Sequence, residues 1–152
     1  MYQIDFHHPI HIYFIGIGGI SMSGLAEILL DEGFTVSGSD MRPSPLTELL
    51  EKRGAHIYYG QRRENLSGDL DLVVYTSAIH PDNPEMQAAA ALSLPLLTRA
   101  ELLGQMMKNY KLPIAISGTH GKTTTTSMAT HIFMAAQADP TVMIGGTLPM
   151  LH

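Results

Sequence analysis

Two short glycine-rich turns constrain this chain more than any other feature. Gly16–Gly19 follows the apolar run of residues 9–15, and Gly118–Gly121 follows the apolar run of residues 113–116. A segment of helical character comes after each turn. A buried strand, a glycine turn and a helix in this order are typical of sites that bind phosphate with backbone N–H groups. The pattern therefore predicts an α/β protein with two phosphate-binding turns.

Strand-like and helix-like segments alternate between these turns. After the strand at 9–15, strands are expected at 34–37, 55–59, 70–75 and 94–97, and helices at 21–30, 46–52, 83–91 and 99–107. Repeated β–α units with short connections predict a Rossmann-like parallel sheet with helices on both faces. We place the domain boundary at Lys111–Pro113, which gives domains 1–110 and 111–152. The second is expected to be the first strand, phosphate loop and helix of an ATPase domain, incomplete because only 28 residues follow Thr124.

Composition excludes several classes of protein. The net charge of -5 argues against a nucleic-acid-binding surface, and the absence of cysteine excludes disulfides and thiolate metal sites. We see neither a signal peptide nor an apolar stretch long enough to insert into a membrane, so we expect a cytoplasmic protein. His7, His8 and His11 have no acidic partner spaced with them, and we expect no metal site there.

The first turn carries a candidate diphosphate site. Its glycines would let the backbone approach phosphate oxygens, and the helix that follows would supply N–H donors. Asp40 lies near the end of the second expected strand, where Rossmann proteins place an acid that binds ribose. From the residues alone, the turn fits a nucleotide diphosphate, the NAD(P) of an oxidoreductase, or a tight turn without a ligand. The candidate binding residues are Gly16, Gly18, Gly19, Ile20, Ser21, Met22, Ser23 and Asp40.

A polar loop follows the fourth expected strand and belongs to the same candidate site. Loops at the carboxyl ends of parallel strands line the ligand crevice of such sheets. The loop supplies two hydroxyl groups, although ordinary turn chemistry would also explain them. Its residues are Thr76, Ser77, Ala78 and Ile79.

The second turn predicts an ATP site. It is shorter than the common P-loop pattern, because Ile116 stands where that pattern begins with glycine. Lys122 would neutralise the β- and γ-phosphate oxygens and is the candidate catalytic residue, and the hydroxyl of Thr123 would bind Mg²⁺. His120 could contact phosphate or substrate, or cap the loop. The candidate ATP-binding residues are Gly118, Thr119, His120, Gly121, Lys122, Thr123 and Thr124.

Taken together, the motifs resemble the N-terminal part of the Mur ligases of peptidoglycan synthesis. The matching segments are residues 14–24, 37–40, 76–79, 82–85, 99–102 and 118–126, of which the last, Gly-Thr-His-Gly-Lys-Thr-Thr-Thr-Thr, is the most specific. The resemblance covers essentially the whole chain. Ser21 stands where the family more often has glycine.

The resemblance implies a three-domain enzyme. Residues 1–110 would bind UDP-N-acetylmuramate, with its diphosphate on the first turn and its uridine near Asp40. Residues from about 112 onward would begin the central ATPase domain, and the L-alanine site would lie in a C-terminal domain beyond His152. Of the family, this chain most resembles the members that join L-alanine to UDP-N-acetylmuramate through an acyl phosphate made from ATP.

Three readings stay open beside this one. The first turn also fits an NAD(P)-binding oxidoreductase domain, the chain could be a non-catalytic nucleotide-binding module, and the related ligase that recycles murein tripeptide uses the same UDP-substrate. We expect these 152 residues to bind UDP-substrate without catalysing ligation. Residues 112–152 could pack on the sheet, pair with a second copy or be partly disordered.

Overall fold

The computed structural model describes residues 3–144, and the chain divides into two compact units, Met1–Lys111 and Leu112–His152. Each unit is described by itself. Residues 145–152 of the predicted second domain lie outside the described residues.

The first unit is built on a five-stranded parallel sheet with the strand order β3-β2-β1-β4-β5. The strands are β1 (His11–Ile15), β2 (Thr35–Asp40), β3 (His56–Tyr59), β4 (Leu72–Tyr75) and β5 (Leu96–Thr98). β1 pairs with both β2 and β4, so the chain order reverses direction across it. Ligands of open α/β sheets bind at such a reversal, beyond the carboxyl ends of the strands. The predicted Rossmann-like parallel sheet is confirmed.

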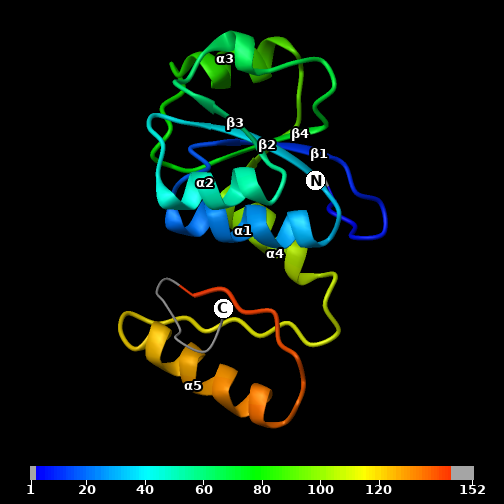
Figure 1. Ribbon diagram of the computed structural model, residues 1–152, viewed down its shortest axis with the longest axis vertical. Coiled ribbons are helices and arrows are strands. Elements are labelled where there is room, and N and C mark those ends of the chain that lie inside the picture. The colour runs from blue at the N-terminus through cyan, green and yellow to red at the C-terminus, as the bar shows by residue number, and fades with distance from the viewer. Residues whose placement is uncertain (1–2, 145–152) are drawn as a thin grey trace. The chain divides into compact units, whose positions relative to one another are not determined.

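Helices cover both faces of this sheet, as predicted. Figure 1 shows α1 (Ile20–Asp31) and α2 (Pro45–Lys52) together on one side and α3 (Pro84–Ala91) on the other. The first two connect strands that progress in one direction, and the third connects strands that progress in the opposite direction. Right-handed crossovers then place the helices on opposite faces. The remaining helix of this unit is α4 (Arg99–Met107), and a short 3₁₀ helix, η1 (Arg63–Asn65), precedes β4.

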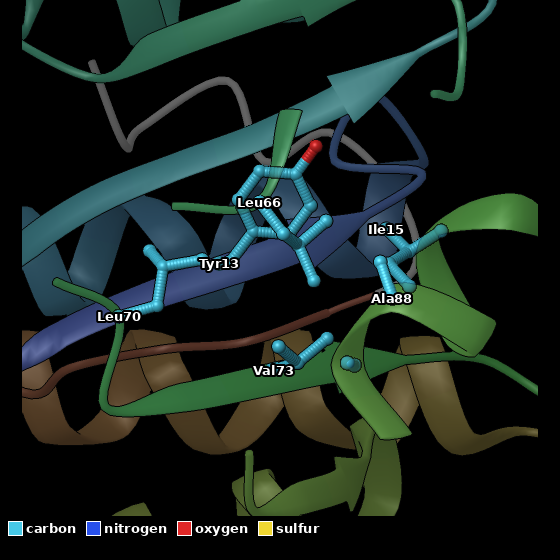
Figure 2. Close-up of a cluster of buried hydrophobic side chains, with 7 residues drawn as sticks. Tyr13, Ile15, Leu66, Leu70, Val73 and Ala88 are labelled. Atoms are coloured by element: carbon cyan, nitrogen blue, oxygen red, sulfur yellow. The ribbon is translucent and has the colours of Figure 1, made fainter. Parts of the chain in front are cut away.

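The central strand β1 explains how the sheet is buried on both sides. Its residues Ile12 to Ile15 are fully buried. Successive side chains point to opposite faces of the sheet, and helices cover both faces. Tyr13 and Ile15 contribute to a cluster on the α3 face together with Leu66, Val73 and Ala88 (Figure 2). An unbroken apolar run is what a parallel strand covered on both faces requires.

The second unit contains one helix among its described residues, α5 (Lys122–Ala135). The strand that we predicted at residues 113–116 is wrong, because residues 112–121 contain no strand. A strand exists only when a neighbour accepts its N–H groups and donates to its C=O groups, and no strand among residues 112–144 pairs with this segment. The helix after the turn formed because its backbone hydrogen bonds are local.

No helix in the described part of the chain is both long enough and apolar enough to cross a bilayer.

Candidate functional site

The helices of this protein begin in two different ways. Side chains of Ser44, Asn83 and Thr98 accept backbone hydrogen bonds at the start of α2, α3 and α4. α1 and α5 begin instead at Gly19 and Gly121, and neither has a side-chain cap in residues 3–144. Since the first N–H groups of a helix have no intrahelical partner, these two helices present open donors, with the positive end of the helix dipole behind them. Both follow the glycine turns that the sequence singled out.

The first turn is tied to the end of β2 by three successive N–H groups. Gly16 N and Ile17 N both donate to Ser39 O, at 2.8 and 2.9 Å. Gly18 N donates to Asp40 Oδ2 at 2.8 Å. The structure thus brings Asp40 to the turn, where its carboxylate accepts from the backbone of the turn itself. Its predicted role near the ribose stays a prediction.

Close packing explains why glycine occupies two of these positions. A Cβ at Gly18 would lie 2.7 Å from Asp40 Oδ2 and 3.0 Å from Thr47 Cγ2. A Cβ at Gly38, inside β2, would lie 2.6 Å from Phe14 O and 3.0 Å from Ile17 Cβ. All four distances are shorter than ordinary van der Waals contacts. A side chain at Gly38 would meet backbone and push β1 and β2 apart, whereas one at Gly18 would displace the Asp40 carboxylate that accepts from the turn.

After the turn, the available donors are the first N–H groups of α1. Ser23 N makes the first helical bond, to Gly19 O at 2.8 Å, and its hydroxyl donates to Ile20 O at 3.1 Å. Ser23 and Met22 are buried, with 2 % exposure each. Of the predicted site residues, Ile20, Ser21 and Met22 therefore offer backbone N–H groups, whereas both donors of Ser23 are engaged within the helix.

The loop after β4 lies against the first turn, as expected for loops at the carboxyl edge. A Cβ at Gly16 would lie 3.9 Å from Ile79 Cδ1, and Ile79 packs on the buried cluster below. Thr76 shapes the loop: its O accepts from Ile79 N at 3.0 Å and its Oγ1 from Ala78 N at 3.3 Å. Ser77 and Ala78 are exposed. The two predicted segments of the UDP-substrate site are thus neighbours.

One basic residue at this edge was not predicted as part of the site. Arg99, at the start of α4, donates from Nη1 to Ser21 Oγ at 3.1 Å. A glycine at position 21 could not accept this hydrogen bond. The bond places a guanidinium beside the N-terminus of α1, where an anion would also be stabilised. The only sequence signal was that Arg99 belongs to one of the matching segments.

The second turn is exposed and less constrained. Gly121 adopts a left-handed conformation with φ 77°, which glycine allows at little cost. Lys122 folds back so that Nζ donates to Gly118 O at 2.6 Å. Residues 117–125, which include the predicted ATP-binding residues, are exposed. These residues form a cation-bearing loop at an open helix start, which fits the phosphates of a nucleotide.

The fit to a magnesium ion rests on one hydroxyl. Thr123 is in the first turn of α5, where a phosphate-bound Mg²⁺ would take a Ser or Thr ligand. Elsewhere in residues 3–144, no group of three His, Asp or Glu side chains could hold a metal ion. The expectation of no acidic partner for the three histidines near the N-terminus is wrong for two of them: His8 Nδ1 pairs with Asp5 Oδ2 at 2.8 Å, and His11 Nδ1 with Asp69 Oδ2 at 3.5 Å.

In the comparison with protein families, the model described as "Mur ligase family, catalytic domain" matches residues 11–111. A UDP-N-acetylmuramate–L-alanine ligase of Agathobacter rectalis is 62 % identical over 152 residues, which are 100 % of this chain and 33 % of the relative. One of Clostridium botulinum is 58 % identical over 142 residues, covering 93 % of this chain and 31 % of the relative. The chain thus spans about a third of the length of the curated relatives it matches.

Solved structures agree with the sequence comparison. The UDP-N-acetylmuramate–alanine ligase MurC of Thermotoga maritima superposes with a TM-score of 0.84 at 36 % identity, covering 91 % of this chain and 32 % of that one. A UDP-N-acetylmuramate:L-alanyl-γ-D-glutamyl-meso-diaminopimelate ligase from Neisseria meningitidis gives the same TM-score, 0.84, at 32 % identity, covering 93 % and 44 %. The glycine turn and its parallel sheet occur in both ligases and oxidoreductases, so the family match decides between them: the chain belongs to the Mur ligase family.

Proposed function

We propose that this chain is the UDP-substrate-binding domain of a ligase that joins L-alanine to UDP-N-acetylmuramate, followed by the beginning of its ATPase domain. The observation that carries the proposal is the uncapped N-terminus of α1. Its turn is fixed to β2 through Gly16, Ile17 and Gly18, and its first N–H groups have no side-chain cap within the described residues. A diphosphate matches such a row of donors in charge and in hydrogen bonding.

The roles of the site residues follow from this placement. The N–H groups of Ile20, Ser21 and Met22 would bind the diphosphate, with Arg99 neutralising charge beside them. Asp40 would hold Gly18 in place at the end of β2, near the nucleoside. The loop of residues 76–79 would close the other side of the crevice.

In the second unit, Gly118 to Thr124 would bind ATP. Lys122 would move from Gly118 O to the phosphates, which offer a stronger, charged acceptor. Thr123 would contribute a hydroxyl to Mg²⁺. Mg-ATP would supply the phosphoryl group that activates the muramate carboxylate for attack by the amine of L-alanine.

Binding of the UDP-substrate is the direct test. Isothermal titration of the 152-residue chain with UDP-N-acetylmuramate should show one site, and NADH should not bind. The reverse preference would overturn the proposal in favour of an oxidoreductase domain. With L-alanine and Mg-ATP added, the chain should release no ADP, because it spans about a third of its ligase relatives. Turnover at the rate of a complete ligase would contradict the expectation that this chain binds the UDP-substrate without catalysing ligation.

The second candidate is the ligase that attaches a tripeptide to the same UDP-substrate. It is supported by the Neisseria meningitidis structure, which superposes as well as the L-alanine ligase does. The curated relatives at 62 % and 58 % identity favour L-alanine. An assay of phosphate release decides between the two candidates. It compares L-alanine with L-alanyl-γ-D-glutamyl-meso-diaminopimelate as the second substrate of the full product of the gene that encodes these residues.

A further inference from the structure

A buried carboxylate, that of Glu85, is connected to the first turn through Ser39 and is not among the site residues described above. Glu85, in the first turn of α3, is fully buried, and its side chain receives three hydrogen bonds. Tyr13 OH donates to Oε1 at 2.8 Å, Asn65 Nδ2 to Oε1 at 2.6 Å, and Ser39 Oγ to Oε2 at 2.5 Å. Within residues 3–144 no ion pair includes Glu85.

Such a group is costly to bury unless its oxygens are satisfied. Here neutral donors from three separate elements satisfy them: β1 through Tyr13, β2 through Ser39 and η1 through Asn65. Burial and the charge of Glu85 raise the pKa of Tyr13, which keeps the phenol protonated and able to donate. The N-terminus of α3 adds the positive end of its helix dipole. Glu85 therefore fixes these elements relative to one another.

One of the three hydrogen bonds leads to the phosphate turn. Ser39 binds Glu85 through its hydroxyl, and its carbonyl accepts from Gly16 N and Ile17 N. The next residue, Asp40, accepts from Gly18 N. The position of the end of β2 thus sets the position of three consecutive amides in the turn. Glu85 holds that end of β2 through Ser39, from the face of the sheet that α3 covers.

We infer that Glu85 is a positioning residue for the diphosphate turn, acting through Ser39. Its chemical role is to hold the end of β2 so that the turn has its binding geometry before the nucleotide arrives. A preset turn loses less freedom on binding, which raises affinity. The effect on affinity rests on the proposed function, the binding of UDP-substrate at this turn. The effect of Glu85 on the geometry of the turn is independent of it.

Amide hydrogen exchange on the ligand-free chain tests the positioning itself. In Glu85→Gln, an NH2 group replaces one of the two accepting oxygens, so one of the three donors loses its acceptor and the charge that strengthens the other hydrogen bonds is gone. We expect exchange at Gly16, Ile17 and Gly18 to become at least about tenfold faster, with little change at the β1–β4 amides. Ser39→Ala, which removes only the hydroxyl, should have the same local effect and serves if Glu85→Gln does not fold.

Tyr13→Phe is the matched control. It removes a donor to the same carboxylate but leaves the bond from Ser39 to Oε2 in place. It should lower the melting temperature without faster exchange in the turn. Equal acceleration in all three variants, or acceleration spread over the whole sheet, would reduce Glu85 to a general structural role and overturn the inference.

Binding of UDP-N-acetylmuramate tests the consequence. Glu85→Gln and Ser39→Ala should each raise the Kd about tenfold, the equivalent of about 1.4 kcal/mol, and the double variant should raise it no further. Tyr13→Phe should leave the Kd within about twofold. Unchanged affinity despite a loosened turn would overturn the role in binding. If the wild-type chain does not bind this nucleotide, the proposed function fails, while the exchange experiment still decides the role of Glu85.

Discussion

The two glycine turns differ in what surrounds them. The first is fixed by β2, which accepts hydrogen bonds from Gly16, Ile17 and Gly18, and its helix start lies beside Arg99. The second, in the part of the chain that the structure describes, is exposed, and Lys122 bonds within the loop to Gly118 O. Both open a helix without a side-chain cap. The difference teaches that glycine spacing creates the open helix start, whereas a neighbouring strand fixes its geometry.

The largest effect should come from adding a methyl group to the fixed turn. Gly18→Ala places a Cβ 2.7 Å from Asp40 Oδ2 and 3.0 Å from Thr47 Cγ2. We expect a loss of about 1–3 kcal/mol in unfolding free energy and a roughly hundredfold weaker affinity for UDP-N-acetylmuramate. Denaturant titration and calorimetry measure the two.

Gly19→Ala is the control for that substitution. The nearest atom to its Cβ is Gly16 O at 3.6 Å, which is ordinary contact, and the backbone is extended with φ -65°. Its stability should stay within about 0.5 kcal/mol of wild type. Equal destabilisation by the two substitutions would show that the turn is not fixed as described.

Limited proteolysis compares the two units directly. Residues 111–115 and 117–125 are exposed, and 112–121 lie outside any helix or strand. Trypsin should therefore cut after Lys111 at least about tenfold faster than after Lys52 or Arg53 in the first unit. Mass spectrometry of early time points identifies the cuts, and early cleavage at residues 52–53 would contradict the expected order.

Removing the charge that holds Gly18 should have an intermediate effect. In Asp40→Asn the amide oxygen can still accept from Gly18 N, but without the ionic contribution, so we expect about five- to tenfold weaker nucleotide binding. Asp71→Asn is the matched control, because Asp71 Oδ2 accepts from His11 N at 2.9 Å at the other end of β1. It should not change the affinity measured by calorimetry. Equal weakening by both would mean that the effect is not local to the turn.

A substitution in the second turn should leave the first site unaffected. Lys122→Met removes the bond to Gly118 O in an exposed loop of the other unit. The Kd for UDP-N-acetylmuramate should change by less than about twofold, since surface changes of this kind cost within about 0.5 kcal/mol. A larger change by titration would show that Lys122 contributes to the first site.

The smallest effect concerns a capped helix. Hydrogen bonds from Thr98 N and Oγ1 to Glu101 Oε2 lower the pKa of Glu101 from its ordinary value of 4.5. A lowered pKa in the folded state means that the carboxylate stabilises the fold above the ordinary pKa and loses this contribution as pH falls through the lowered value. Glu101→Gln should therefore lower the melting temperature slightly at pH 7, and this difference should shrink as the pH falls below the ordinary pKa. A difference that grows on acidification would contradict the cap.

Much of the fold could be predicted because its signals are local. The apolar run of β1, the glycine turn after it and the Pro and Gly residues between elements fixed the order of strands and helices. The predicted strand at residues 113–116 is wrong because a strand needs a partner, which its own sequence does not contain. The helix α5 was predictable because its hydrogen bonds lie within the segment.

The contacts of the candidate site were less accessible to sequence reasoning. Asp40 could be expected close to the first turn, because it ends β2, which neighbours β1. Arg99 contacts Ser21 from 78 residues away, and Glu85 contacts Tyr13 from 72 residues away. An acidic residue after Asn83 and Pro84 looks like an ordinary member of a helix start. Only the packing of α3 against the sheet shows that Glu85 is buried. The ligand roles of all these residues, and the roles of the two domains, stay predictions.

Gly38 has a consequence for anyone who would transplant the first turn into another protein. Glycine weakens a strand, yet at this position a side chain would meet Phe14 O and Ile17. The neighbours Ser39 and Asp40 supply the acceptors for the turn. The portable unit is therefore discontinuous: a graft of the glycine loop must bring residues 38–40 with it, on an adjacent parallel strand in the same register. A search for this site in other sequences gains specificity if it asks for both halves at once.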